Sequence, residues 1–299
     1  MSGHRCGTVA LVGRPSTGKS SLLNRLAGAK LAIVSPKAQT TRHAVRGVVS
    51  GAQCQMIVED LPGYQLRHGG VLNRALNRRA AEGARECDVA ALVVEALRFG
   101  DADRAALAGI PPSVPVVAVV NKVDLVPAAA ELLPFLERLR RERDFAAIVP
   151  VSARTGRNLA ELERVLRGLL PEAPAAYPAG QLTDRDERFL AAELLREKLF
   201  RFLGEDLPYR CDVSIESFRE ERRGGRLALR RIEAVIWVER GSQKAIVVGR
   251  AGEMLKRVSS AARKDMERLF GGKVYLGAWV KVKRDWTRDA RLLRQLGYG

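Results

Sequence analysis

The sequence predicts an α/β protein: a doubly wound, mostly parallel sheet with helices on both faces, followed by a smaller α+β domain. Over residues 9–170, apolar runs typical of buried strands alternate with helical patterns, as such a sheet requires. The proline- and alanine-rich segment 171–180 then interrupts the alternation. Beyond it the expected elements follow the order α-β-β-α-α-β. We therefore expect a first domain at 1–170, a linker at 171–183 and a second domain at 184–299.

Short apolar runs predict the strands of the first domain, at 9–12, 44–50, 53–59, 89–94, 114–120 and 147–151. The second and third of these strands are expected to form an antiparallel hairpin. Helical spacing of apolar side chains predicts the helices between the strands, at 21–27, 71–87, 131–143 and 158–170. In a sheet of this kind, ligands bind at the carboxyl ends of the strands.

The second domain is expected to open with one long amphipathic helix at 184–203. The elements expected after it are two strands, two helices and a last strand, at 211–218, 227–239, 242–248, 253–270 and 273–283. A basic tail at 284–294 follows the last strand.

The chain has 299 residues, enough for two domains with cores of their own. Its net charge of +17 is typical of proteins that meet nucleic acid or an anionic membrane surface. No apolar run approaches the ~20 residues that span a bilayer, and the N-terminus lacks the apolar core of a signal peptide. The cysteines are scattered without C-x-x-C spacing, which argues against a zinc site and fits the reducing cytoplasm.

The segment 13–20, GRPSTGKS, matches the phosphate-binding pattern G-x-x-x-x-G-K-[ST] and lies between an expected strand and an expected helix. Its glycines let backbone N–H groups converge on a phosphate, and the positive end of the helix adds to the attraction. Lys19 is expected to reach the β- and γ-phosphates, and the Ser20 hydroxyl to bind Mg²⁺. The nucleotide-binding residues expected here are Gly13, Arg14, Pro15, Ser16, Thr17, Gly18, Lys19, Ser20 and Ser21.

Three further motifs each follow an expected strand, in the order that a guanine-nucleotide site needs. Asp60 can bind Mg²⁺ through water, and the Gly63 N–H can sense the γ-phosphate. Asp124 can accept two hydrogen bonds from guanine, a pair of donors that adenine lacks. The expected nucleotide-binding residues are Asp60, Leu61, Pro62 and Gly63, then Asn121, Lys122 and Asp124, then Ser152 and Ala153, where a backbone N–H would face the guanine O6. In this order the motifs predict a GTP-binding domain.

The segment 39–42, QTTR, is the expected switch region. One threonine should bring its hydroxyl to Mg²⁺ when the γ-phosphate is present; Thr41 is favoured and Thr40 is the alternative. Tyr64 stands where many related GTPases carry a glutamine that orients water. Because no side chain is an obvious base, we expect positioning and electrostatics to drive a slow hydrolysis. The expected catalytic residues are Lys19, Thr41 and Gly63, and the expected Mg²⁺ ligands are Ser20, Thr41 and Asp60.

A second site is expected at the loop 249–252, GRAG, between the last two helices. Its two glycines allow phosphates to approach the main chain, and its arginine adds positive charge. KH domains use a G-x-x-G loop between helices to clamp about four nucleotides of single-stranded RNA. The RNA-binding residues expected here are Gly249, Arg250, Ala251, Gly252, Lys256 and Arg257.

From about residue 7 to residue 283 the chain resembles the bacterial Era GTPases. The resemblance extends beyond the general nucleotide motifs to KAQTTRH at 37–43, QLTDR at 181–185, AARKDME at 261–267 and KVYL at 273–276. It implies a P-loop GTPase domain followed by a type II KH domain. It also implies binding to the 3′ end of 16S rRNA, a role in maturation of the small ribosomal subunit, and some association with the inner face of the cell membrane. A cytoplasmic monomer with Mg²⁺ and GTP or GDP as ligands is expected.

Two departures from the family pattern concern the nucleotide site. Family members usually have an asparagine at the position of Ser16, and in related GTPases that asparagine helps to hold an activating K⁺ ion. The sequence therefore does not support potassium activation. Leu61 replaces the usual threonine of D-T-P-G, but Asp60 and Gly63 are kept, so Mg²⁺ binding and γ-phosphate sensing should survive.

Other functions remain open from the sequence. The chain could be an RNA-binding assembly scaffold whose nucleotide site scarcely hydrolyses GTP, which Ser16 and Tyr64 favour slightly. It could be a membrane-surface GTPase, although no long basic amphipathic helix stands out. A tRNA-modifying GTPase would need a catalytic cysteine or a cofactor domain that the sequence does not show. The basic tail could contact RNA or membrane, or be a solvated end.

Overall fold

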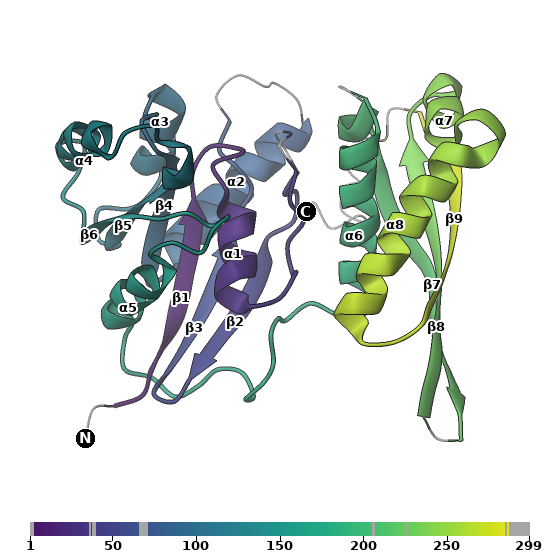
Figure 1. The fold of residues 1–299 in the computed structure, drawn as a ribbon, viewed down its shortest axis with the longest axis horizontal. Helices are drawn as coiled ribbons and strands as arrows, with labels where there is room; N and C mark the ends of the chain where they lie inside the picture. Colours follow the sequence, from purple (N-terminus) through teal and green to yellow (C-terminus); the bar gives the residue numbers. More distant parts are fainter. Residues whose placement is uncertain are drawn as a thin grey trace. The chain divides into compact units, whose positions relative to one another are not determined.

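The computed structural model describes residues 3–35, 37, 40–65, 71–204, 207–224, 226–284 and 286. The chain divides into two compact units (Figure 1). The first comprises Met1–Ala32 and Thr41–Asp184, and the second comprises Ile33–Thr40 and Arg185–Gly299. Gln39 of the expected switch region and most of the basic tail lie outside the described residues.

The first unit contains a six-stranded sheet in the order β2-β3-β1-β4-β5-β6. Neighbouring strands are parallel except for β2 and β3, which form the expected antiparallel pair. The doubly wound, mostly parallel sheet predicted from the sequence is therefore confirmed. The strands are β1 (Arg5–Val12), β2 (Val45–Gly51), β3 (Cys54–Asp60), β4 (Val89–Glu95), β5 (Val116–Asn121) and β6 (Ala147–Pro150).

Helices cover both faces of this sheet, and Figure 1 shows α1 and α2 on opposite sides of it. Apolar side chains of α2, α3 and α4 pack in one buried cluster with β4 and β5, and its members include Ala84, Leu107, Phe135, Leu92 and Val120. These helices are α1 (Lys19–Ala27), α2 (Val71–Glu86), α3 (Asp101–Ala108), α4 (Leu132–Arg140) and α5 (Leu159–Leu169).

Helix α3 was not expected from the sequence. It is only eight residues long, so its apolar spacing does not stand out. Its start is nevertheless marked by a local signal: the Asp103 carboxylate accepts a hydrogen bond from the Gly100 N–H at 3.1 Å. Helices are commonly capped in this way: the side chain of the third helical residue accepts a hydrogen bond from the backbone of the residue before the helix.

The second unit has the expected order α-β-β-α-α-β. Strands β7 and β8 are antiparallel, and β9 lies parallel to β8 at the edge of the sheet. Strand β7 runs further than the expected 211–218, to Arg223, which lies opposite Arg226 of β8. The elements are α6 (Glu187–Phe202), β7 (Asp212–Arg223), β8 (Arg226–Val238), α7 (Gly241–Val248), α8 (Glu253–Phe270) and β9 (Val274–Val282).

Helix α6 differs from the amphipathic helix that was expected, because charged as well as apolar side chains along it are buried. The Arg196 guanidinium makes two hydrogen bonds to the Glu193 carboxylate, at 2.7 and 2.6 Å. Lys198 pairs with Asp265 on α8. Burial of a charge is tolerated when a partner of opposite charge is buried with it, so the helical period of apolar residues alone could not reveal this arrangement.

The segment 171–183, expected as a linker, lies along the first unit and is held by hydrogen bonds. The Gln55 side chain accepts from the N–H groups of Ala176 and Tyr177, both at 2.8 Å. The Val48 N–H donates to the Leu182 carbonyl at 2.8 Å. These bonds satisfy main-chain groups that a proline-rich segment cannot pair within itself.

The four cysteines are free and buried. Among the described helices, none is long and apolar enough to cross a membrane.

Candidate nucleotide site and RNA-binding groove

The phosphate loop joins β1 to α1, and two of its glycines are required by close contacts. Gly13 has φ +147°, and a Cβ there would lie 2.4 Å from the Val93 carbonyl oxygen. Gly18 has φ +99°, and a Cβ there would lie 2.2 Å from the Asn121 side-chain nitrogen. Any other residue at these positions would displace the loop. The first turn of α1 follows at once, so its free N–H groups open into the loop.

The Lys19 side chain spans the loop. Its ammonium donates to the carbonyl oxygens of Gly13 at 3.0 Å and Arg14 at 2.9 Å. Burial lowers the pKa of Lys19 to about 8, although the nearby Asp60 carboxylate opposes this shift. The group therefore remains largely protonated at neutral pH. A phosphate next to it would favour the charged form and raise the pKa again.

The side chains of Arg14, Thr17 and Ser16 in the phosphate loop differ in their contacts and exposure. Arg14 turns towards carboxylates, with Glu95 at 3.3 Å and Asp103 at 3.3 Å. Thr17 is buried, and its hydroxyl donates back to the Arg14 carbonyl at 3.2 Å. Ser16 is exposed with φ +62°. Positive φ suits asparagine better than serine, so the backbone here retains the geometry that the family's usual residue favours.

Three oxygen-bearing side chains converge beside the loop. The Ser20 hydroxyl donates to Asp60 at 2.6 Å and lies 2.9 Å from the Thr41 hydroxyl. Thr41 in turn lies 3.3 Å from the same Asp60 oxygen. The Thr40 hydroxyl instead donates to the Lys37 carbonyl at 2.6 Å. The structure thus brings Thr41, and not Thr40, to the other two expected ligands, and this set of oxygen atoms fits Mg²⁺.

The segment after β3 packs against the phosphate loop. A Cβ on Gly63 would lie 2.7 Å from the Pro15 nitrogen, and the Tyr64 N–H donates to the Gly13 carbonyl at 3.1 Å. Leu61 is fully buried, and the Tyr64 side chain packs against the apolar cluster of the sheet. The Gly63 backbone therefore lies close to where the phosphate loop would hold a γ-phosphate.

The guanine motifs meet at the carboxyl ends of β5 and β6. The Asn121 amide donates to the Thr17 carbonyl at 2.8 Å and accepts from the Ala153 N–H at 3.0 Å. The Asp124 carboxylate accepts from the Ser152 hydroxyl at 2.5 Å and pairs with Arg154 at 2.7 Å. The Ser152 hydrogen bond and then Arg154 hold the pKa of Asp124 below its usual value, against the opposing effect of burial. Asp124 is therefore a charged acceptor, as guanine recognition requires.

Sequence reasoning missed two residues of this site. Glu95, at the end of β4, accepts from the Lys122 ammonium at 2.9 Å and also pairs with Arg14, so it links the base motif to the phosphate loop. Burial acts to raise the pKa of Glu95, but the hydrogen bond and the charge of Lys122 outweigh this effect. The net pKa of Glu95 is therefore below its usual value. Arg154 follows Ser152 and Ala153 directly. The position of Glu95 at a strand's carboxyl end was the available signal.

The loop 249–252 connects α7 to α8 with an unusual backbone. Gly249, Ala251 and Gly252 all have positive φ, of +75°, +49° and +81°. A Cβ on Gly249 would lie 2.7 Å from the Met254 Cβ, whereas a Cβ on Gly252 would meet nothing within 4 Å. Gly249 therefore cannot take a side chain without displacing Met254.

A groove of about 360 Å³ opens beside this loop, between α8 and β9. Lys256, expected from the sequence, lines it. Arg257 does not, because its guanidinium lies 4.4 Å from the Phe202 ring. Gly252, also expected from the sequence, lines it too. The other lining residues, which sequence reasoning missed because they depend on how α8 packs on β9, are Leu255, Ser259, Ser260, Arg263, Leu276 and Ala278. The lining thus combines apolar side chains, two serine hydroxyls, Lys256 and Arg263, which is paired with Glu267 at 2.6 Å. A lining of this kind suits a single-stranded nucleic acid.

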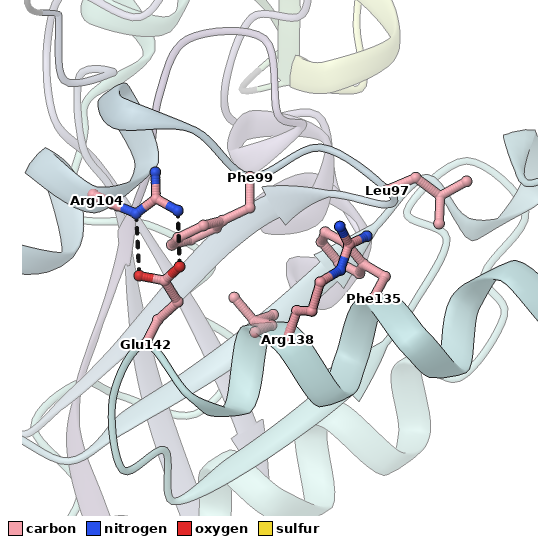
Figure 2. Close-up of a pocket in the computed structure, with 7 residues that line it drawn as sticks. Leu97, Phe99, Arg104, Phe135, Arg138 and Glu142 are labelled. Carbon is pink, nitrogen blue, oxygen red and sulfur yellow. Dashed lines mark hydrogen bonds and ion pairs between the residues drawn. The ribbon is translucent and has the colours of Figure 1, made fainter.

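A smaller hollow of about 150 Å³ lies in the first unit, next to α3 and α4 (Figure 2). Arg104 and Glu142 form two hydrogen bonds across it, at 3.2 and 2.9 Å, and Arg104 also lies 5.4 Å from the Phe99 ring. None of the expected site residues lines this hollow. The ion pair joins α3 to the segment just after α4.

Two family models match the chain. A model described as a 50S ribosome-binding GTPase matches residues 8–122, and a model described as a KH domain matches residues 206–287. Curated relatives are similar over nearly the full length. GTPase Era of Nitrosomonas eutropha is 49% identical over 297 residues, covering 99% of both chains. GTPase Era of Chromobacterium violaceum is 47% identical over 292 residues, covering 98% of this chain and 97% of the relative.

Two solved structures share the whole fold. A variant of Aquifex aeolicus Era bound to GDP and AlF₄⁻ is 35% identical, covers 99% of both chains and has a TM-score of 0.94. Era in complex with MgGDPNP and nucleotides 1506–1542 of 16S ribosomal RNA is 34% identical with the same coverage and TM-score. With the motifs and the fold in agreement, the chain belongs to the Era family of GTPases, in which a GTPase domain is followed by a KH domain.

Proposed function

We propose that this chain binds GTP with Mg²⁺, hydrolyses it slowly in the cytoplasm, binds the 3′ end of 16S rRNA through its KH groove and assists assembly of the small ribosomal subunit. The observation that carries the proposal is the convergence of Ser20, Thr41 and Asp60 at the phosphate loop of a chain that also has a G-x-x-G groove. The similar structure that holds MgGDPNP and nucleotides 1506–1542 of 16S rRNA supports both halves.

Ser20, Thr41 and Asp60 would hold Mg²⁺, which when bound neutralises charge on the β- and γ-phosphates. Lys19 supplies a second positive charge, and the Gly63 N–H can donate to a γ-phosphate oxygen. Tyr64 packs against the core, and a phenol is too weak a base to activate water at neutral pH. These residues support slow hydrolysis by positioning. Ser16 lacks an amide oxygen, so its side chain does not support potassium activation.

Replacing Asp124 by asparagine should switch base choice from guanine to xanthine. The amide mismatches the two guanine donors but can pair with xanthine, so GTP affinity should fall by about 100-fold or more while XTP affinity rises. Competition binding with GTP, XTP and ATP measures this. The matched control is Asp144→Asn, an exposed carboxylate in the same unit. Gain of ATP binding, or no change, would contradict the guanine assignment.

Replacing Thr41 or Thr40 by alanine should separate their roles. Thr41→Ala removes a hydroxyl that faces Ser20 and Asp60, so the Mg²⁺ concentration for half-maximal GTP hydrolysis should rise by at least about tenfold. Thr40→Ala removes only the hydrogen bond to Lys37 and should leave the Mg²⁺ dependence unchanged. Hydrolysis assayed over a Mg²⁺ titration tells the two apart, and the reverse result would assign the ligand to Thr40.

Carboxylates in the G-x-x-G loop should abolish RNA binding without unfolding the protein. Ala251→Asp with Gly252→Asp places negative charge in two left-handed positions that aspartate tolerates, and avoids Gly249. Affinity for nucleotides 1506–1542 of 16S rRNA should fall at least about tenfold through repulsion of phosphates. The control pair Ala251→Asn with Gly252→Asn has the same shape without the charge. Equal RNA affinity in both pairs would reject this groove as the RNA site.

One further part of the proposal concerns coupling between nucleotide and RNA. The segment Ile33–Thr40 belongs to the second unit. In that unit the Lys37 ammonium donates to the Leu203 carbonyl at 2.7 Å, just beyond α6, while its own carbonyl accepts from Thr40. The next residue is Thr41, which faces Ser20. Movement of Thr41 with the γ-phosphate would therefore be transmitted to residues held at the end of α6.

RNA should accordingly bind tighter to the GTP form, with a coupling of about 1–3 kcal/mol, or about 5- to 150-fold. RNA affinities measured with a non-hydrolysable GTP analogue, with GDP and without nucleotide test this. Lys37→Met should reduce the difference between nucleotides while RNA affinity without nucleotide stays unchanged. Equal affinities of the unaltered protein in all three conditions would mean that the two sites are only tethered.

A further inference from the structure

In the described part of the second unit, helices cover one face of the sheet, and the other face carries exposed aromatic side chains. Apolar side chains of α6 and α8 form a buried cluster with alternate residues of β8 and β9, such as Ile236 and Val280. The residues between them point to the other face. In the strand register Arg231 lies opposite Tyr275, Val235 opposite Trp279, and Trp237 opposite Lys281. We call Arg219, Arg231, Trp237, Tyr275, Trp279 and Lys281 the open face.

Two large aromatic side chains are exposed on this face. Trp279 is 51% exposed and Tyr275 is 48% exposed. They lie four residues apart on β9, about 13 Å along the strand. Gly277 stands between them, and a Cβ there would lie 2.9 Å from the outer edge of the Trp279 ring. The indole therefore lies over Gly277, where any larger residue would meet it.

Cations accompany the rings. The Arg231 guanidinium lies 4.7 Å from the Tyr275 ring centroid, and the Lys281 ammonium lies 5.8 Å from that of Trp237. Trp237 is itself fixed, since its indole N–H donates to the Ser214 hydroxyl at 2.9 Å. Across the hairpin, Arg219 lies opposite Arg231. Proteins that bind single-stranded nucleic acids commonly combine flat rings with positive charges. The bases stack on the rings, and the charges attract the phosphates.

Two carboxylates share the face. Glu221 pairs with Arg231 at 2.8 Å. Glu233 lies opposite Gly277 in the register, between the levels of Tyr275 and Trp279. A carboxylate among bases is an acceptor for their exocyclic amino groups. It disfavours a lipid surface, where headgroup phosphates would meet this negative charge.

Strand β9 connects the open face to the KH groove. Leu276 and Ala278 line the groove from one side of β9, and Tyr275 and Trp279 project from the other. Because β9 is the edge strand of this sheet among the described residues, a strand of RNA that leaves the groove needs only to pass over that edge to reach the rings. Continuity with the groove favours RNA over a protein partner.

We propose that the open face is a second single-stranded RNA subsite, which stacks bases that flank those held at the G-x-x-G loop. The inference rests on the proposed function of the groove. It extends the RNA footprint beyond the about four nucleotides that one KH groove holds, with Tyr275 and Trp279 as stacking platforms.

The test uses the full chain and RNA of nucleotides 1506–1542 of 16S rRNA, with nested truncations from either end, in a fluorescence anisotropy assay. The core fragment is the shortest RNA whose binding still falls in the Ala251→Asp, Gly252→Asp variant. Trp279→Ala and Tyr275→Ala should each lower the affinity for the long RNA by about 5- to 150-fold. The affinity for the core fragment should stay within about twofold of that of the unaltered protein. Trp279→Phe keeps a stacking ring and should retain most of the affinity. Leu133→Ala, which removes an exposed apolar side chain on α4, is the control.

Unchanged long-RNA affinity in both alanine variants would overturn the proposal and leave the face to a protein partner. Equal weakening of long RNA and core fragment would also overturn it, since the rings would then only support the groove. Failure of the groove itself gives a different result: the Ala251→Asp, Gly252→Asp variant would bind the long RNA as tightly as its asparagine counterpart.

Discussion

The buried side chain of Asn121 holds the nucleotide-binding loops of the first unit together. Its amide nitrogen binds the Thr17 carbonyl in the phosphate loop, and its oxygen binds the Ala153 N–H beside the expected base position. Loss of either bond would leave a buried polar atom without a partner, at a cost of about 1–3 kcal/mol. Gly18 must be a glycine because the Asn121 amide occupies the space of a Cβ. The Asn121 side chain therefore positions both the phosphate-binding loop and the base-binding loop.

The charges around the phosphate loop are arranged so that the loop can accept an anion. Burial lowers the pKa of Lys19 to about 8 while two carbonyl groups hold its ammonium across the loop. Glu95 neutralises Arg14 and Lys122 outside the loop and holds both away from its centre. Lys19 is therefore a cation fixed across the loop. Fixed charges of this kind need little reorganisation when a phosphoryl group is transferred.

The second unit uses one strand for two purposes. Leu276 and Ala278 on β9 line the groove beside the G-x-x-G loop, whereas Tyr275 and Trp279 project to the open face. This division follows from the period of two along a strand, and from the position of β9 at the edge of its sheet. An interior strand would have had a neighbouring strand along both of its edges, so RNA could not have passed around it from one face to the other.

Local patterns in the sequence determined the order of strands and helices apart from the short α3, the strand–loop–helix of the phosphate site and the guanine motifs, because each depends on residues close together in the chain. Tertiary structure alone decided that Thr41 rather than Thr40 meets Asp60, and that Glu95 joins the site. It also turned Arg257 away from the groove and brought Met254 against Gly249. These outcomes depend on side-chain direction and on packing between distant segments, and neither is encoded in the spacing of residues along the chain.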